Sequence, residues 1–120
     1  MGLFGTKGKK REKTEKVPDM DEKSLLKALD SHEKVVVDCW GTHCAPCRKI
    51  HPIMEDLAEK YPDIFFGKLN TEEWLSIAVK NGVMSVPTIL FFRNGKLVGS
   101  LSGTTSKNDI ESEMKRKLEV

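Results

Sequence analysis

Residues 35–47 read VVVDCWGTHCAPC, and this stretch decides the fold. Its first half is an apolar, β-branched run of strand length, which is typical of a strand in the middle of a sheet that is covered on both faces. Its second half holds Cys44 and Cys47 with Pro46 between them, and proline suits the first turn of a helix. The stretch therefore predicts a buried strand followed directly by a helix that carries two cysteines at its start.

The spacing of the two cysteines indicates a reversible disulfide. Positions i and i+3 of an α-helix have Cα atoms about 5 Å apart, which is within the range that a disulfide needs. Cys44 would lie at the helix start, where unpaired N–H groups and the helix dipole favour a thiolate, and Cys47 would be shielded one turn inside. We therefore expect Cys44 to attack disulfides and Cys47 to resolve the mixed disulfide that forms.

Helix and strand patterns alternate on both sides of this stretch. They predict helices over residues 21–31, 46–61, 72–81 and 106–118, and strands over 35–40, 64–69, 88–92 and 97–98. The last two strands form a hairpin, because Asn94-Gly95 supplies the positive φ angles of a tight turn. A strand–helix–strand crossover makes the first two strands parallel. The order predicts an α/β protein with three layers, in which helices cover both faces of a mixed central sheet.

The distribution of charge divides the chain into two parts. Its 120 residues suit a single domain, and the net charge is +2. Residues 1–17 carry a net charge of +4 and show no apolar period, so we expect a flexible basic arm there and one domain over 18–120. The domain is left with a net charge of −2, and such a body lacks the basic folded face that nucleic-acid binding needs.

The three cysteines indicate a reducing compartment. An odd number of cysteines in a small chain argues against a secreted disulfide scaffold. The start of the chain lacks the apolar run of a signal peptide, and no stretch reaches membrane-spanning length. We therefore expect a cytoplasmic monomer that binds neither membrane nor nucleic acid. Cys39, in the predicted core strand, is expected to be a buried and inert thiol.

The sequence resembles the thioredoxin family over roughly residues 18–118. The matching residues are Val35-Val36-Val37-Asp38, Trp40, Cys44-Ala45-Pro46-Cys47, Pro52, Lys68-Leu69-Asn70, Val86-Pro87-Thr88 and Gly103. The resemblance implies a thioredoxin-like fold and a thiol–disulfide oxidoreductase that reduces disulfides in target proteins. It also implies recycling by a thioredoxin reductase-type electron donor, with no bound cofactor or metal. Pro46 beside Cys47 favours the reducing direction by the same resemblance.

The resemblance assigns further roles around the cysteine pair. Asp38 resembles the family's buried acid beneath Cys47, with Lys68 as its partner. A buried carboxylate prefers its neutral form, which suits it to carry a proton for the resolving thiol. The substrate-binding residues implied by the resemblance are Trp40, Val86, Gly103 and Pro87, the last with a cis peptide bond.

Three features depart from the family pattern. His43 stands where the family usually has tryptophan, Ala45 stands where it usually has glycine, and the arm replaces part of the family's first strand. His43 either tunes the Cys44 thiolate or is an aromatic replacement without effect, and both interpretations stay open. His51 follows Cys47 by four residues and shares its helix face. A solvent-side histidine is the default expectation for His51, with tuning of the site as the alternative.

Two other functions stay open at this point. An oxidising or isomerising exchanger would use the same two cysteines. A zinc-binding module would take Cys44 and Cys47 together with His43 or His51, since two thiolates and two imidazoles suit zinc. The second alternative is weaker, because His43 adjoins Cys44 and a second Cys-x-x-Cys pair is missing.

Overall fold

The computed structural model describes residues 16–120. Its helices and strands are α2 (Glu22–Ser31), β1 (Lys34–Trp40), α3 (Ala45–Lys60), β2 (Phe65–Asn70), α4 (Leu75–Lys80), β3 (Thr88–Arg93), β4 (Lys96–Ser102) and α5 (Lys107–Leu118). None of the helices in this described part is long and apolar enough to cross a membrane.

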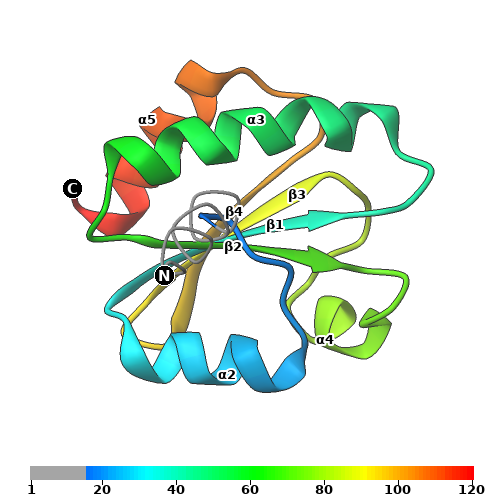
Figure 1. Cartoon of the computed structure of the whole chain (residues 1–120), viewed down its shortest axis with the longest axis horizontal. Coiled ribbons are helices and arrows are strands. Elements are labelled where there is room, and N and C mark those ends of the chain that lie inside the picture. Colours follow the sequence, from blue (N-terminus) through cyan, green and yellow to red (C-terminus); the bar gives the residue numbers. More distant parts are fainter. Residues whose placement is uncertain (1–15) are drawn as a thin grey trace, which may run out of the picture.

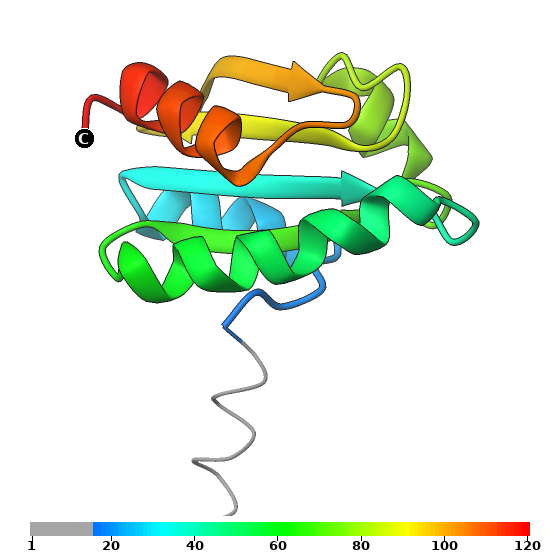
Figure 2. The same cartoon turned by 90° about the horizontal axis from the view of Figure 1, so that it is seen from above.

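The four strands form one mixed sheet in the order β2-β1-β3-β4. β1 pairs with β2 in parallel, and β1–β3 and β3–β4 are antiparallel. Helices α3 and α5 cover one face of the sheet, and α2 and α4 cover the other (Figure 1). Figure 2 shows α5 beside β3 and β4, and α3 beside β1 and β2. The predicted α/β class with three layers is confirmed.

The central strand β1 is buried on both sides, as its apolar run predicts. Residues 35–39 are each at most 1% exposed. Val36 packs among side chains of α3 and α5, whereas Val37 and Cys39 pack among side chains of α2 and α4. Side chains alternate between the two faces of a strand, so Asp38 shares the face of Val36, beneath α3. This alternation places the one carboxyl of the strand under the helix that carries the cysteine pair.

The helix predicted over 72–81 is shorter in the structure, because its first residues form a turn instead. The backbone N–H of Glu72 donates to the Asn70 side chain, and that of Trp74 donates to the Asn70 carbonyl. These bonds hold the chain in the turn until α4 begins at Leu75. Gly82 follows the helix with a φ of 79°, which is the left-handed conformation that glycine adopts readily.

The hairpin and the chain before α2 also follow the sequence signals. Asn94 and Gly95 have φ angles of 53° and 78°, as the tight turn requires. Within residues 16–120, only an isolated parallel bridge between Asp19 and Lys68 stands where the family's first strand is expected. Most of the predicted arm, residues 1–15, lies outside the described residues. Val17 is 2% exposed and packs in the core beneath α3.

Candidate active site

The two cysteines lie at the start of α3 and differ in environment. Cys44 is the N-cap residue, and its Sγ accepts a hydrogen bond of 3.2 Å from the backbone N–H of Cys47. The pair forms a disulfide with a Cα–Cα distance of 5.3 Å. Cys44 is half-buried, whereas Cys47 is completely buried. Only the sulfur at the helix start is therefore open to a partner, and it lies at the positive end of the helix dipole with the Cys47 N–H pointing at it.

The loop that leads into Cys44 is held by Glu72, a residue that the sequence did not suggest. The Glu72 carboxylate accepts from the Thr42 backbone N–H at 3.0 Å and from the Thr42 hydroxyl at 2.6 Å. These hydrogen bonds hold the pKa of Glu72 below its usual value, and the nearby exposed His43 adds a smaller effect in the same direction. Glu72 follows the end of β2 as the loop follows the end of β1. The predicted parallel pairing of these two strands was therefore the available signal.

A second loop meets the same edge of the sheet. The Val86–Pro87 peptide bond is cis, as the family resemblance predicted. Thr88 at the start of β3 pairs with Cys39 near the end of β1, which places Pro87 close to the start of the cysteine loop. A Cβ atom on Gly41 would lie only 3.4 Å from a Val86 methyl group, so the two loops are in contact.

Gly103 lies on the other side of the cis-proline loop. Its backbone N–H donates to the Pro87 carbonyl at 2.9 Å, and its φ of 90° is one that glycine adopts without strain. The Thr88 hydroxyl also donates to the Ser85 carbonyl, at 2.7 Å. The structure thus joins Val86, Pro87 and Gly103 into one edge beside the cysteine loop.

Asp38 is completely buried beneath α3, and neither carboxyl oxygen has a hydrogen-bond partner. Burial raises the pKa of Asp38 to about 7, although the Lys68 cation opposes part of that rise. Lys68 is opposite Asp38 in the β1–β2 register, but its ammonium group lies 4.0 Å from the Asp19 carboxylate. Lys68 therefore acts on Asp38 through its charge, while its ion pair is with Asp19.

His51 does not lie on the solvent side of α3, so the default expectation for this residue is wrong. Its Nε2 lies 3.5 Å from Oδ2 of Asp38, and only 27% of its side chain is exposed. The ring of Trp40 stands edge-on to the imidazole, with the centroids 5.6 Å apart and the planes at 86°. The shared helix face with Cys47 was the available signal, since Cys47 lies against the sheet.

Cys39 is separated from the cysteine pair by the sheet. It packs with the side chains of α2 and α4, and it is completely buried. Burial, with a smaller effect of the Asp38 charge, raises the pKa of the Cys39 thiol to about 12. The group stays a neutral thiol at physiological pH, in agreement with the expected inert role.

The zinc alternative finds no support. Within residues 16–120, no three His, Cys, Asp or Glu side chains come together as a metal site would need.

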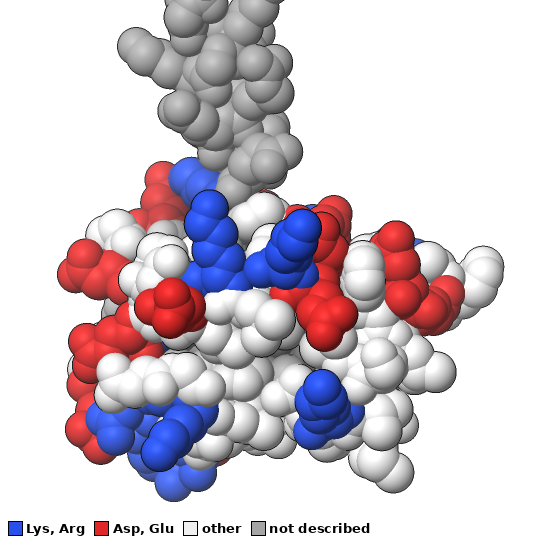
Figure 3. Space-filling model, turned by 90° about the horizontal axis from the view of Figure 1, so that it is seen from below, with Lys and Arg blue, Asp and Glu red and all other residues white. Residues whose placement is uncertain are grey.

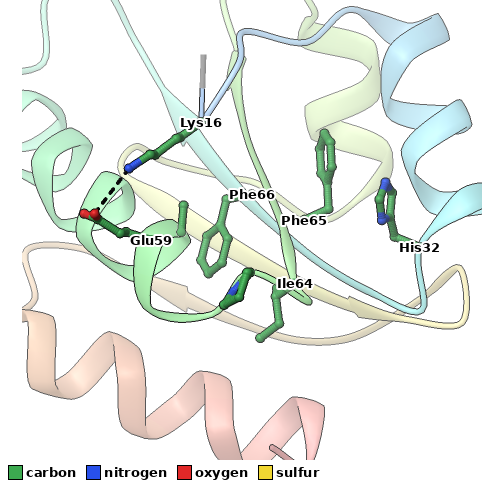
Figure 4. Close-up of a pocket in the computed structure, with 8 residues that line it drawn as sticks. Lys16, His32, Glu59, Ile64, Phe65 and Phe66 are labelled. Carbon is green, nitrogen blue, oxygen red and sulfur yellow. Dashed lines mark ion pairs between the residues drawn. The ribbon is translucent and has the colours of Figure 1, made fainter. Parts of the chain in front are cut away.

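A separate cavity of about 350 Å³ lies toward the far end of α3, where Lys16 and Glu59 form an ion pair of 3.6 Å near Phe66 (Figure 4). Its lining residues include neither cysteine and come mostly from the last turn of α3, the loop that follows it and the start of β2, so this cavity is distinct from the cysteine site.

Comparisons with known proteins agree with this site. A family model for thioredoxin matches residues 16–116. The thioredoxin of Chlorobaculum thiosulfatiphilum is 36% identical over 95 residues, which is 78% of this chain and 88% of the relative. Thioredoxin M4 of Arabidopsis chloroplasts is 36% identical over 102 residues, which is 83% of this chain and 53% of the relative. The oxidised mitochondrial thioredoxin 3 of Saccharomyces cerevisiae superimposes with a TM-score of 0.78 at 25% identity, and the match covers 87% of this chain and 98% of that one.

The fold and the site define a protein with a disulfide-bonded Cys-x-x-Cys pair at a helix start beside a cis-proline loop. The chain belongs to the thioredoxin family, which confirms the resemblance noted in its sequence. It spans between 52% and 62% of the length of three chloroplastic relatives that it matches.

Proposed function

We propose that this chain is a thiol–disulfide oxidoreductase that reduces disulfides in target proteins. One observation carries the proposal: Cys44 and Cys47 form a disulfide at the start of α3, with one sulfur accessible and the other buried. Membership of the thioredoxin family supports the same activity. Pro46 beside Cys47 matches the family pattern, and this resemblance supports reduction rather than oxidation or isomerisation.

The reaction consists of two exchanges. In the first, the Cys44 thiolate attacks one sulfur of the target disulfide, and the other target sulfur leaves as a thiolate. In the second, the Cys47 thiolate attacks the Cys44 sulfur and releases the remaining target sulfur. Two electrons pass from the dithiol to the target. The hydrogen bond from the Cys47 N–H to the Cys44 Sγ favours the thiolate that begins the cycle.

Asp38 would take the proton of Cys47 before the second exchange. Its raised pKa of about 7 leaves both protonation states populated near neutral pH, so the same carboxyl can accept and release a proton. The Lys68 cation keeps that pKa from rising further. Asp38 is thus the proposed proton carrier, and Lys68 its electrostatic partner.

The substrate would bind as an extended chain along the cis-proline edge. Val86, Pro87 and Gly103 lie on that edge, and Trp40 is half-buried at the end of β1 nearby. The proposed partners are disulfide-containing proteins and a thioredoxin reductase-type electron donor. On the face of the molecule in Figure 3, basic and acidic side chains are interspersed, which supports the absence of nucleic-acid binding.

The proposal includes a cytoplasmic location, a monomeric state, one domain over 18–120 and no membrane association. The odd number of cysteines and the burial of Cys39 support a reducing compartment. A domain start near residue 18 is supported by the pairing of Pro18 and Met20 with Lys68, and the burial of Val17 in the core extends the packed part of the chain by one residue.

Trapping of the mixed disulfide tests the two cysteine roles. Reduced Cys47→Ser protein mixed with insulin should accumulate a covalent complex through Cys44, because the second exchange is removed. Cys44→Ser serves as the matched control and should form none, since the buried Cys47 cannot reach a partner. Intact-mass spectrometry measures both adducts. Equal trapping by the two variants would contradict the assignment.

A further inference from the structure

Unpartnered polar atoms concentrate at one place in the core. Four buried side-chain nitrogen or oxygen atoms within residues 16–120 lack a hydrogen-bond partner: both carboxyl oxygens of Asp38, Nε1 of Trp40 and Nε2 of His51. Buried polar groups are nearly always paired, so each exception needs an explanation. These three residues are neighbours, with His51 on α3 and Asp38 and Trp40 on β1. Their grouping points to a shared role.

His51 connects the buried carboxyl with the surface of the molecule. Asp38 is completely buried, whereas 27% of the His51 side chain is exposed. The imidazole Nε2 faces Oδ2 of Asp38 at 3.5 Å, and the edge-on Trp40 ring holds the imidazole in that orientation. A slight approach would turn this distance into a hydrogen bond. The side chain therefore reaches both the carboxyl and solvent.

The proposed catalytic cycle needs such a connection. Asp38 can take the proton of Cys47 only as the carboxylate, so molecules that hold Asp38 protonated near neutral pH must lose that proton before the second exchange, yet the carboxyl itself has no contact with solvent. The geometry points to His51 as the proton relay between Asp38 and solvent. This inference rests on the proposed function and extends it by one residue, which acts through Asp38 rather than on the sulfur atoms.

The proton balance of the relay is simple. Cys47 gives its proton to the Asp38 carboxylate and, as a thiolate, attacks the Cys44 sulfur. The protonated carboxyl then passes that proton to Nε2 of the neutral imidazole, in the tautomer that carries its own proton on Nδ1. The imidazolium releases a proton from Nδ1 to water. The cycle ends with Asp38 ionised and His51 neutral in the other tautomer. Because Nε2 is buried in this orientation, the ring returns to the first tautomer by turning Nε2 to solvent, where its proton exchanges with water, and turning back.

The charges around the imidazole keep it able to accept a proton. Asp38 faces it from β1, Lys68 acts from β2, Asp19 acts from the segment before α2, and Cys47 lies one turn earlier on its own helix. Burial lowers the pKa of His51 below its usual value, the Lys68 cation lowers it further, and Asp19 partly offsets both. These effects together favour the unprotonated ring.

A stopped-flow experiment separates the two exchanges. Reduced full-length protein is mixed with an equimolar dithiobis-nitrobenzoate, an aromatic disulfide that releases one coloured thiolate when Cys44 attacks and another when Cys47 resolves. His51→Gln removes the titratable group and keeps a polar side chain of similar size. His32→Gln is the matched control, because His32 is exposed and contacts Phe65 instead of Asp38.

We expect the first phase to be unchanged in His51→Gln and the second to be about tenfold slower near neutral pH. Added imidazole buffer should restore that second phase, while the wild-type and His32→Gln rates should not depend on buffer concentration. A wild-type second phase in His51→Gln overturns the relay. So does a slow second phase that no buffer restores, which would indicate a packing role. Absence of both phases in the wild-type protein would contradict the proposed function itself.

Proton NMR gives a test that does not need a His51 variant. The His51 ring resonances of the wild-type chain should show a second inflection as Asp38 titrates, and Asp38→Asn should remove it. A single inflection that Asp38→Asn leaves unchanged overturns the coupling between the two groups.

Discussion

Asp38→Asn should become more stable relative to the wild-type protein as the pH rises. Asp38 is completely buried without a hydrogen-bond partner, and its pKa is raised from 3.8 to about 7 by burial. The folded state therefore prefers the protonated carboxyl. Below the unfolded pKa this group carries no penalty, and the penalty grows as the pH rises until it is complete above the folded pKa. Asparagine has the same shape and does not ionise.

The size of the effect follows from the two pKa values. One pKa unit corresponds to about 1.4 kcal/mol, so the full penalty above pH 7 is about 4 kcal/mol. Between about pH 5 and about pH 8, the penalty grows by about 3 kcal/mol. The buried amide carries a desolvation cost of its own, but that cost does not change with pH. The slope of the stability difference against pH is therefore the informative quantity.

Urea unfolding of the oxidised proteins across this pH range measures the difference. The free energy of unfolding of Asp38→Asn minus that of the wild type should increase steadily with pH. Asp63→Asn is the matched control, because Asp63 is exposed and its replacement should give a difference that stays flat. If the stability difference for Asp38→Asn also stays flat with pH, the claim that burial raises the pKa of Asp38 would be refuted.

Three further replacements test other parts of the site and core. Glu72→Gln should slow insulin reduction without unfolding the protein, because the charge that holds the Thr42 N–H and hydroxyl is lost; an unchanged rate would exclude a positioning role. His43→Trp should lower the reduction potential, most clearly in mildly acidic buffer, because a protonated imidazole beside Cys44 favours the thiolate. Glutathione redox titrations at acidic and alkaline pH check this, and equal potentials at both would leave His43 without a role. Leu57→Ala should cost about 3 kcal/mol in urea unfolding, since Leu57 is completely buried, and a cost near zero would contradict that packing.

Local signals were sufficient where neighbours in sequence determine the structure. The apolar run of β1 predicted a strand buried on both faces, and Asn94-Gly95 predicted its turn from backbone conformation alone. The Cys-x-x-Cys spacing predicted a pair that can close at a helix start, and the structure has that disulfide. The cis bond before Pro87 came from the family resemblance rather than from any local rule.

Contacts between distant segments were beyond the reach of those signals. Glu72 and Thr42 are 30 residues apart, and their hydrogen bonds depend on the side-by-side ends of β1 and β2. The four-residue spacing placed His51 on the face of Cys47, but it did not show that this face points at Asp38. That relation depends on how α3 crosses the sheet, which the sequence pattern does not define.

Insulin reduction by the wild-type protein and by two variants that each replace one cysteine tests the central claim most directly. With dithiothreitol as electron donor, the wild type should accelerate insulin precipitation, Cys44→Ser should not, and Cys39→Ala should match the wild type. Cys39 is a suitable control because it lies on the opposite face of the sheet from α3. Activity that persists in Cys44→Ser, or that disappears in a folded Cys39→Ala protein, would contradict a disulfide reductase that works through Cys44 and Cys47.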